Sequence, residues 1–204
     1  MATYLEQSLC KIKEFEGCIP WMYRDTAGKI TVGVGLMLPD AEAAAALPFR
    51  VGAVAVSQDA IRAEYERVKG LPEGRAAIFY RKSSSPVLAE AAIDAMLREV
   101  LVGFEGKLRG ALKGYDGYPL GAKLALLDMV YNLGPEGLLH GYPKLVSAIE
   151  EGRWTDAAAD CSRHGPNTER NEWTRDQFLG RLTGPIRAEA EVGLKRLWRM
   201  LRGV

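Results

Sequence analysis

Two acidic residues and one threonine near the N-terminus have the types and spacing that cleavage of a glycosidic bond needs. Asp25 lies nine positions after Glu16, and Thr31 follows six positions later. Such cleavage uses one carboxylic acid to protonate the leaving oxygen and a second carboxylate across the bond. We interpret Glu16, next to an apolar helix stripe, as the proton donor and Asp25 as the ionised partner. Thr31 would hold a water for Asp25 to activate, which favours an inverting single displacement.

The same residues also have a simpler interpretation. Two acids near a hairpin are common, and these can be surface carboxylates plus an ordinary turn aspartate. Residue types and spacing alone therefore leave both interpretations open.

The sequence around the three residues predicts a helix followed by a β-hairpin. The apolar positions of 4–15 have helical spacing, and Gly17 is a natural stop after them. A short strand over 21–24 leads into turn residues at 25–28, and a return strand rich in β-branched residues covers 29–34. Glu16 is therefore expected to project from a helix end beside the hairpin.

Alternation along the return strand separates its two faces. The β-branched apolar residues share one face, and Thr31, Gly33 and Gly35 share the other. Because glycines leave space beside a backbone, we expect the second face to be open to a chain-like ligand.

The stretch 37–86 predicts a short helix over 41–47, a loop or short strand over 49–56, and a helix over 61–68 that begins after an N-cap at Ser57. A polar loop over 81–86 is the best internal boundary in the chain.

From 87 onward the pattern predicts almost only helices, over 90–107, 120–133, 142–150, 154–162, 170–182 and 185–201. The helix over 120–133 is apolar nearly all round, which is typical of a central buried helix. The last helix is basic, and we interpret its cations as a solvated face, with a polymer-binding stripe as the alternative: Arg187, Lys195, Arg196, Arg199 and Arg202.

Composition is that of an ordinary globular chain. The 204 residues are 48% hydrophobic and 26% charged, and the net charge of +1 gives no global attraction to nucleic acid. We expect no membrane-spanning helix and no signal peptide.

The sequence has three cysteines, and an odd number without a regular spacing argues against a disulfide scaffold. Cys161 and His164 could contribute to a zinc site, but no second ligand pair follows, and we expect no metal.

These elements predict an α+β, mainly helical fold with two lobes. One domain over 1–204 is expected, with a small hairpin lobe at about 13–86 and a larger helical lobe at about 87–204 that also takes the N-terminal helix. A cleft between two such lobes is where a ligand would usually bind.

Several blocks in order resemble the phage-type lysozymes, glycoside hydrolase family 24. These blocks are Glu16-Gly17, Tyr23-Arg24-Asp25, Gly28 and Thr31–Gly35, then Met129–Gly134, Ala148–Ala158 and Arg170–Trp173. The resemblance implies a lysozyme-like fold and a muramidase that hydrolyses the β-1,4 bond between N-acetylmuramic acid and N-acetylglucosamine in peptidoglycan, without a cofactor. It also implies that Glu16 is the general acid and that Asp25 and Thr31 position the attacking water.

The same resemblance suggests five substrate-binding residues, which are Met37, Tyr131, Asn132, Lys144 and Arg170. Tyr131 could equally be a core aromatic, and Asn132, expected to orient Glu16, could instead be a helix C-cap. Arg170 is expected to hold a cleft acid or the lobe interface. Two departures from the family stand out: Leu36 replaces a frequent histidine, and 37–86 is longer than in short phage enzymes.

Expected partners follow from this resemblance. The main partner is the glycan strand of peptidoglycan. The segment 37–86 could be a contact surface for a delivery machine or an inhibitor (immunity) protein. We expect no nucleic acid partner and a monomeric protein. We expect synthesis in the cytoplasm and action in the periplasm or on the cell wall, either as a phage endolysin released through a holin-type pore or as an antibacterial effector exported by a secretion system. A lytic transglycosylase and a non-catalytic peptidoglycan-binding module are the alternatives.

Overall fold

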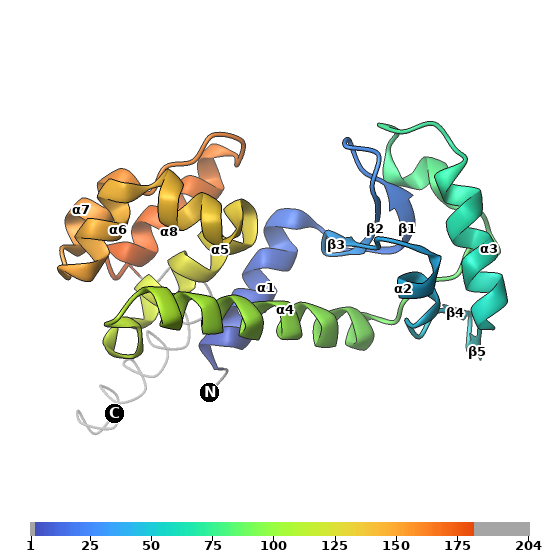
Figure 1. The fold of residues 1–204 in the computed structure, drawn as a ribbon, viewed down its shortest axis with the longest axis horizontal. Coiled ribbons are helices and arrows are strands. Elements are labelled where there is room, and N and C mark those ends of the chain that lie inside the picture. The colour runs from blue at the N-terminus through green and yellow to red at the C-terminus, as the bar shows by residue number, and fades with distance from the viewer. Residues whose placement is uncertain (1–2, 182–204) are drawn as a thin grey trace, which may run out of the picture. The chain divides into compact units, whose positions relative to one another are not determined.

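The computed structural model describes residues 3–181 and divides into two compact units (Figure 1). The sheet unit is Leu9–Val100, and the helical unit combines Met1–Ser8 with Leu101–Val204. The boundaries fall within helices α1 (Tyr4–Glu16) and α4 (Glu90–Ala111). The predicted basic helix over 185–201 lies outside the described residues.

The sheet unit opens with the predicted helix and hairpin. After α1 the chain forms β1 (Ile19–Arg24), β2 (Ile30–Gly33) and β3 (Leu36–Met37), an antiparallel sheet in the order β1-β2-β3. Gly17 ends α1 with a positive φ of 75°, and its N–H donates to the backbone oxygen of Lys13 at 2.9 Å. The prediction missed only the short third strand.

The stretch after β3 belongs to the sheet unit's own packing. It forms α2 (Ala41–Ala45), the hairpin of β4 (Arg50–Val51) and β5 (Val54–Ala55), α3 (Gln58–Lys69) and the 3₁₀ helix η1 (Ala77–Tyr80). Asp40 caps α2 and Ser57 caps α3 through their side-chain oxygens. Buried side chains from this stretch and from the sheet make up the core of the unit: Met22, Ile30, Val32, Val34, Phe49, Ile61, Tyr65, Val68 and Tyr80.

The prediction of an open second face on β2 is wrong at Gly33. A Cβ placed on Gly33 would lie 3.2 Å from the Ile93 side chain, so α4 fills the space that the missing side chain leaves. Gly33 therefore allows close helix–strand packing. Gly35, in the turn before β3, is exposed and has a φ of 79°.

The helical unit contains the rest of α4, a 3₁₀ turn η2 (Tyr115–Gly117), and helices α5 (Leu120–Gly141), α6 (Pro143–Glu150), α7 (Trp154–Asp160) and α8 (Thr168–Phe178). The expectation of a central buried helix is confirmed, because α5 is almost continuously buried from Gly121 to Val130. Gly134 breaks α5 at a φ of 72° and a ψ of 164°, close to its predicted end. The fold is therefore α+β and mainly helical, as predicted.

Within the helical unit, α5 and α8 pack too closely for a side chain at Gly121. A Cβ at that position would lie 2.2 Å from the backbone oxygen of Gln177 in α8. Since the obstacle is backbone, the helices would have to separate.

Gly121→Ala is expected to lower the free energy of unfolding by about 2–3 kcal/mol, because overpacking a rigid helix contact forces the backbone to shift. Gly106→Ala on α4, where nothing lies within 4 Å of the added carbon, is the matched control and should stabilise by about 0.5–1 kcal/mol. Urea denaturation followed by circular dichroism measures both. Equal stability of the two variants would contradict the packing described.

Candidate functional site

Asp25 is fixed in place by the turn that it forms. Its Oδ1 accepts hydrogen bonds from the backbone N–H groups of Ala27 at 2.9 Å and Lys29 at 2.8 Å, and its own N–H donates to the Lys29 oxygen at 2.9 Å. Gly28 supplies the positive φ of 73° that closes the turn. One carboxylate oxygen is thus held by backbone. The other receives no hydrogen bond within the described range 3–181 and is the oxygen that can take a water.

A row of three side chains crosses the sheet beside this turn. Tyr23 pairs with Thr31 across β1 and β2, and Thr31 pairs with Met37 across β2 and β3. Directly opposed residues in an antiparallel sheet share one face, so a phenol, a hydroxyl and a thioether lie in line. Thr31 is buried at 4% exposure, its hydroxyl donating to the Lys29 oxygen at 3.3 Å, whereas Met37 is 51% exposed.

Glu16 is the last residue of α1, and its side chain is exposed. The charge of Glu16 acts on the phenol of Tyr23 in β1. Burial raises the pKa of the Tyr23 phenol above its ordinary value, and the charges of Asp25 and Glu16 raise it further. Both predicted acids therefore act on the same phenol, that of Tyr23.

Tyr23 is a site residue that the sequence interpretation did not single out. The signal was present, because strand alternation from Asp25 places Tyr23 on the same face, directly before the turn.

Neutralising either acid should lower the pKa of Tyr23. Asp25→Asn is expected to lower it more than Glu16→Gln, since the Asp25 charge has the larger effect on the phenol. Removing a negative charge makes the phenolate easier to form, so the titration moves to lower pH. NMR of the tyrosine ring carbons against pH measures the shift, with Tyr23→Phe to assign the signal.

Glu14→Gln is the matched control, because Glu14 also lies in the last turn of α1 but pairs with Lys11 at 2.7 Å. It should leave the Tyr23 titration unchanged. A titration that moves in neither acid variant would show that the two carboxylates do not flank the phenol.

The remaining predicted substrate-binding residues lie in the helical unit. Tyr131 and Asn132 are on α5, just before the break at Gly134. Tyr131 is half-buried and packs edge-on against Phe104 with ring centres 6.3 Å apart, whereas Asn132 is exposed. The predicted role of Asn132 beside Glu16 stays a prediction, as does sugar contact by Tyr131.

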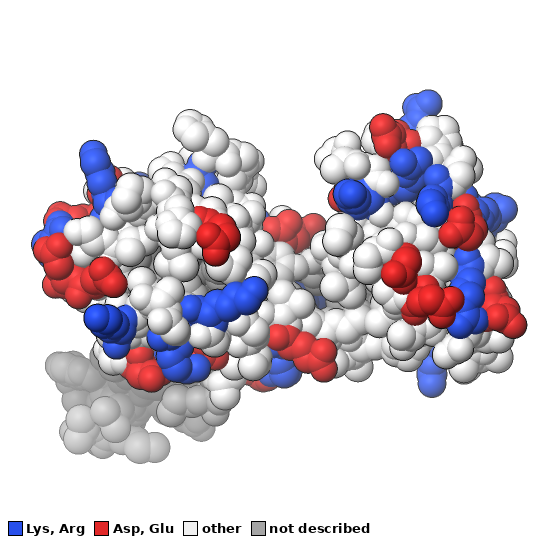
Figure 2. Space-filling model, viewed as in Figure 1, with Lys and Arg blue, Asp and Glu red and all other residues white. Residues whose placement is uncertain are grey.

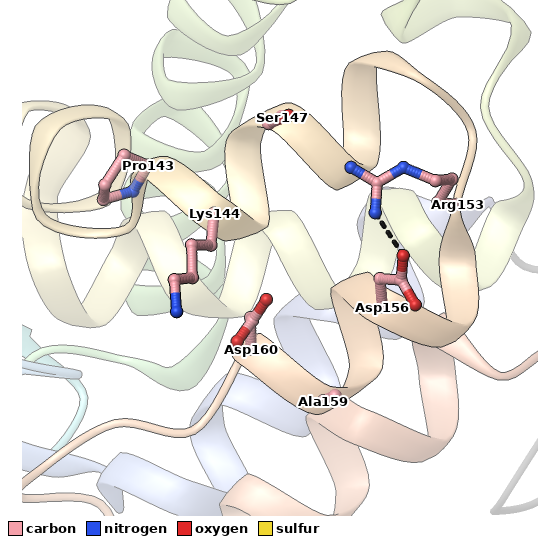
Figure 3. A pocket seen from close by; sticks show the side chains of 7 residues that line it. All are labelled: Pro143, Lys144, Ser147, Arg153, Asp156, Ala159 and Asp160. Carbon is pink, nitrogen blue, oxygen red and sulfur yellow. Dashed lines mark hydrogen bonds and ion pairs between the residues drawn. The ribbon is translucent and has the colours of Figure 1, made fainter.

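Lys144 borders a pocket between α6 and α7, with a volume of about 480 Å³ (Figure 3). The Lys144 amine and the Asp160 carboxylate extend into the space between the two helices, and Ser147 lies on the α6 side. Arg153 and Asp156 form an ion pair at one end of the pocket. This pocket can take a ligand with both acidic and basic groups.

Arg170 is buried inside the helical unit, where it binds Asp128 of α5. Its Nε donates to Asp128 Oδ1 at 2.9 Å. Arg163 donates to Asp128 Oδ2 at 2.7 Å, and the Thr174 hydroxyl lies 3.1 Å from the same oxygen. All four residues are at most 5% exposed. Sequence reasoning missed Asp128 and Arg163, although Asp128 was one of only two charges on an otherwise apolar helix.

Asp128→Ala should destabilise the helical unit by about 3–5 kcal/mol, because it leaves two buried guanidinium groups without their carboxylate. Asp116→Ala, which removes an exposed partner of Arg109, is the control and should leave the unfolding midpoint nearly unchanged. Thermal unfolding measures both variants. A small effect of Asp128→Ala would mean that the network adds little to stability.

The cysteines have no metal-binding surroundings in the described part of the chain, where no group of three or more candidate ligands occurs. Cys161 is buried, and burial raises the pKa of its thiol to about 11. Its Sγ donates to the Ala158 oxygen at 3.3 Å, so it is a neutral, structural thiol. Cys10 and Cys18 are exposed free thiols.

A small antiparallel sheet joined to a larger set of helices is the architecture of the lysozyme-like fold, and the chain adopts it. A crystal structure of a P22 lysozyme mutant is similar, with a TM-score of 0.53 and 17% sequence identity, and the similarity covers 88% of this chain and 99% of that chain. No family model matches the sequence, and no curated protein matches it closely. At this identity the likeness establishes the fold, and the roles of individual residues are argued from the chain itself.

The site residues thus fall into two groups. Glu16, Asp25, Thr31 and Met37 lie in the sheet unit, and Tyr131, Asn132, Lys144 and Arg170 lie in the helical unit. In the sheet unit Thr31 pairs with Tyr23 across β1 and β2, and the charges of Asp25 and Glu16 both raise the pKa of the Tyr23 phenol. No described helix is long and apolar enough to cross a bilayer.

Proposed function

We propose that the protein is a muramidase that hydrolyses the β-1,4 bond between N-acetylmuramic acid and N-acetylglucosamine in peptidoglycan. The observation that carries this proposal is the Asp25 carboxylate, held by two backbone N–H groups in the turn next to the Tyr23–Thr31 pair, in the same unit as Glu16 at the end of α1. The lysozyme-like fold and the name of its neighbour, a lysozyme, support it. Membership of glycoside hydrolase family 24 is part of the proposal.

The roles follow from the surroundings of each group. Glu16, at the exposed end of α1, donates the proton to the leaving oxygen. Asp25 is oriented by two backbone N–H bonds and has its second oxygen available to activate water. The Thr31 hydroxyl, two residues after the Lys29 that closes the turn, positions that water. The exposed Met37, paired with Thr31 across the sheet, contacts a sugar. Attack by this water gives inversion.

The proposal also gives roles to residues of the helical unit. Tyr131, Asn132 and Lys144 are proposed to contact the glycan strand or its peptide, and Arg170 acts by keeping α8 fixed to α5 through Asp128.

Two other activities remain to be separated from this one. A lytic transglycosylase needs only one acid and leaves anhydro-sugar ends, and the ordered Asp25 beside Thr31 favours hydrolysis over it. A non-catalytic peptidoglycan-binding module would need neither acid.

Digestion of purified peptidoglycan, followed by mass spectrometry of the fragments, is expected to give reducing ends. Glu16→Gln and Asp25→Asn should each slow release by about a hundredfold or more, because each removes an acid–base group. Glu14→Gln is the control with unchanged rate. Anhydro ends would indicate the transglycosylase, and binding without release at any pH would indicate the binding module.

Delivery to the cell wall is a further part of the proposal, because peptidoglycan lies outside the cytoplasmic membrane. We propose action in the periplasm or on the wall after passage through a holin-type pore or a secretion system. Expression with an added periplasmic export signal should lyse a Gram-negative host, whereas cytoplasmic expression and exported Glu16→Gln should not. Culture turbidity measures this, and harmless export of active wild-type protein would contradict it.

A further inference from the structure

Two large apolar residues that are consecutive in sequence are exposed on the surface of the sheet unit. Ile78 and Phe79 in η1 are 63% and 49% exposed, while the next residue, Tyr80, is fully buried. Ile78 and Phe79 are two of the seven large hydrophobic residues that are exposed among residues 3–181. The pair lies outside the row of residues assigned to the proposed chemistry.

The segment that carries this pair is held rigidly. The Tyr80 hydroxyl donates to the Pro72 oxygen at 2.7 Å, and the Arg67 guanidinium donates to the Tyr80 oxygen at 2.6 Å. The Trp21 indole N–H donates to the Ala77 oxygen at 2.9 Å, which ties η1 to β1. Ile78 and Phe79 are therefore presented by an ordered backbone, so a partner would not have to order this segment on binding.

Two arginine side chains lie over aromatic rings, one ring in η1 and one in the strand β1 that is hydrogen-bonded to η1. The Arg75 guanidinium lies 5.8 Å from the centre of the Phe79 ring, and that of Arg81 lies 4.6 Å from the centre of the Trp21 ring. Stacking fixes each planar group while leaving its N–H donors available. Neither arginine has a carboxylate within 4 Å among residues 3–181.

The nearby carboxylates are already paired with other cations. Glu73 binds Arg24 at 3.0 Å, and Glu64 binds Arg67 at 2.6 Å. In Figure 2, several basic side chains, with an acidic one among them, lie at the end of the sheet unit where the β1–β2 turn and the segment after α3 lie. The surface around Ile78 and Phe79 thus carries uncompensated positive charge and complements an acidic partner.

We propose that this surface, the η1 patch (Trp21, Arg75, Ile78, Phe79 and Arg81), is the docking site of a protein partner that offers an apolar pocket rimmed by carboxylates. Aromatic residues and arginine are the residue types that dominate protein–protein hot spots. Guanidinium groups match carboxylates with two parallel hydrogen bonds. The proposal does not depend on the proposed hydrolase activity.

The chemistry of the patch favours a protein over the other anionic or ring-stacking ligands. A glycan stacks on open aromatic faces, and here an arginine covers one face of each ring. A lipid surface is bound by a broad apolar face with many basic residues around it, whereas η1 exposes two apolar side chains on a short turn.

A phage-displayed library of random peptides tests the proposal. Selection on immobilised wild-type protein, with depletion on the Ile78→Ser/Phe79→Ser variant, is expected to enrich peptides that combine acidic and apolar residues. The enriched peptide is then synthesised, and its affinity is measured by fluorescence anisotropy. Both Ile78→Ser/Phe79→Ser and Arg75→Glu/Arg81→Glu should weaken its Kd by about tenfold or more.

Val51→Ser/Val54→Ser on the β4–β5 hairpin is the matched control, because these residues are 41% and 71% exposed but lie on another element. This variant should bind the peptide like wild type. The proposal is overturned if no peptide is enriched over the depleted background, or if both η1 variants retain the wild-type Kd. Binding of chitohexaose or of phosphatidylglycerol vesicles that needs the same residues would also overturn it and assign the surface to a glycan or a membrane.

Discussion

The hydrogen bonds from Ala27 and Lys29 to Asp25 Oδ1 are the interaction on which the site depends. They make a flexible hairpin tip into a fixed turn, and Gly28 makes that turn possible because its φ of 73° is costly for other residues. The turn sets the β1–β2 register, which in turn aligns Tyr23, Thr31 and Met37 in a row. The Asp25 carboxylate therefore has two roles. Its Oδ1 holds the turn, and its Oδ2 is the oxygen that takes part in the proposed chemistry.

The rest of the chain supports this arrangement by packing, unit by unit. In the sheet unit, Ile93 fills the space beside Gly33, and the 37–86 stretch supplies much of the core around the sheet. In the helical unit, Asp128 joins α5 to α8 through two buried arginines, so that a single carboxylate orders both helices. One carboxylate thus orders the β1–β2 turn, and another, buried in the helical unit, ties α5 to α8.

Much of this could be predicted from the sequence. The helix stop at Gly17, capping at Ser57 and the apolar profile of α5 follow from local patterns, and these predictions are confirmed. The prediction that α5 ends at 133 is wrong, because the helix resumes after the break at Gly134 and ends at Gly141. Long-range contacts were not predictable from such patterns. The local sequence around Gly33 does not predict its contact with Ile93. The sequence around Asp128 likewise does not predict its ion pairs with Arg163 and Arg170, because these contacts depend on the packing of distant elements.

The central claim is that the Tyr23–Thr31–Met37 face of the sheet is where the glycan reacts. Titration of chitohexaose into isotope-labelled Glu16→Gln protein, followed by amide NMR, tests it most directly. The account predicts saturable shifts at Tyr23, Thr31 and Met37, with the β4–β5 hairpin unaffected. Saturable binding that leaves all three of these amides unchanged would contradict it.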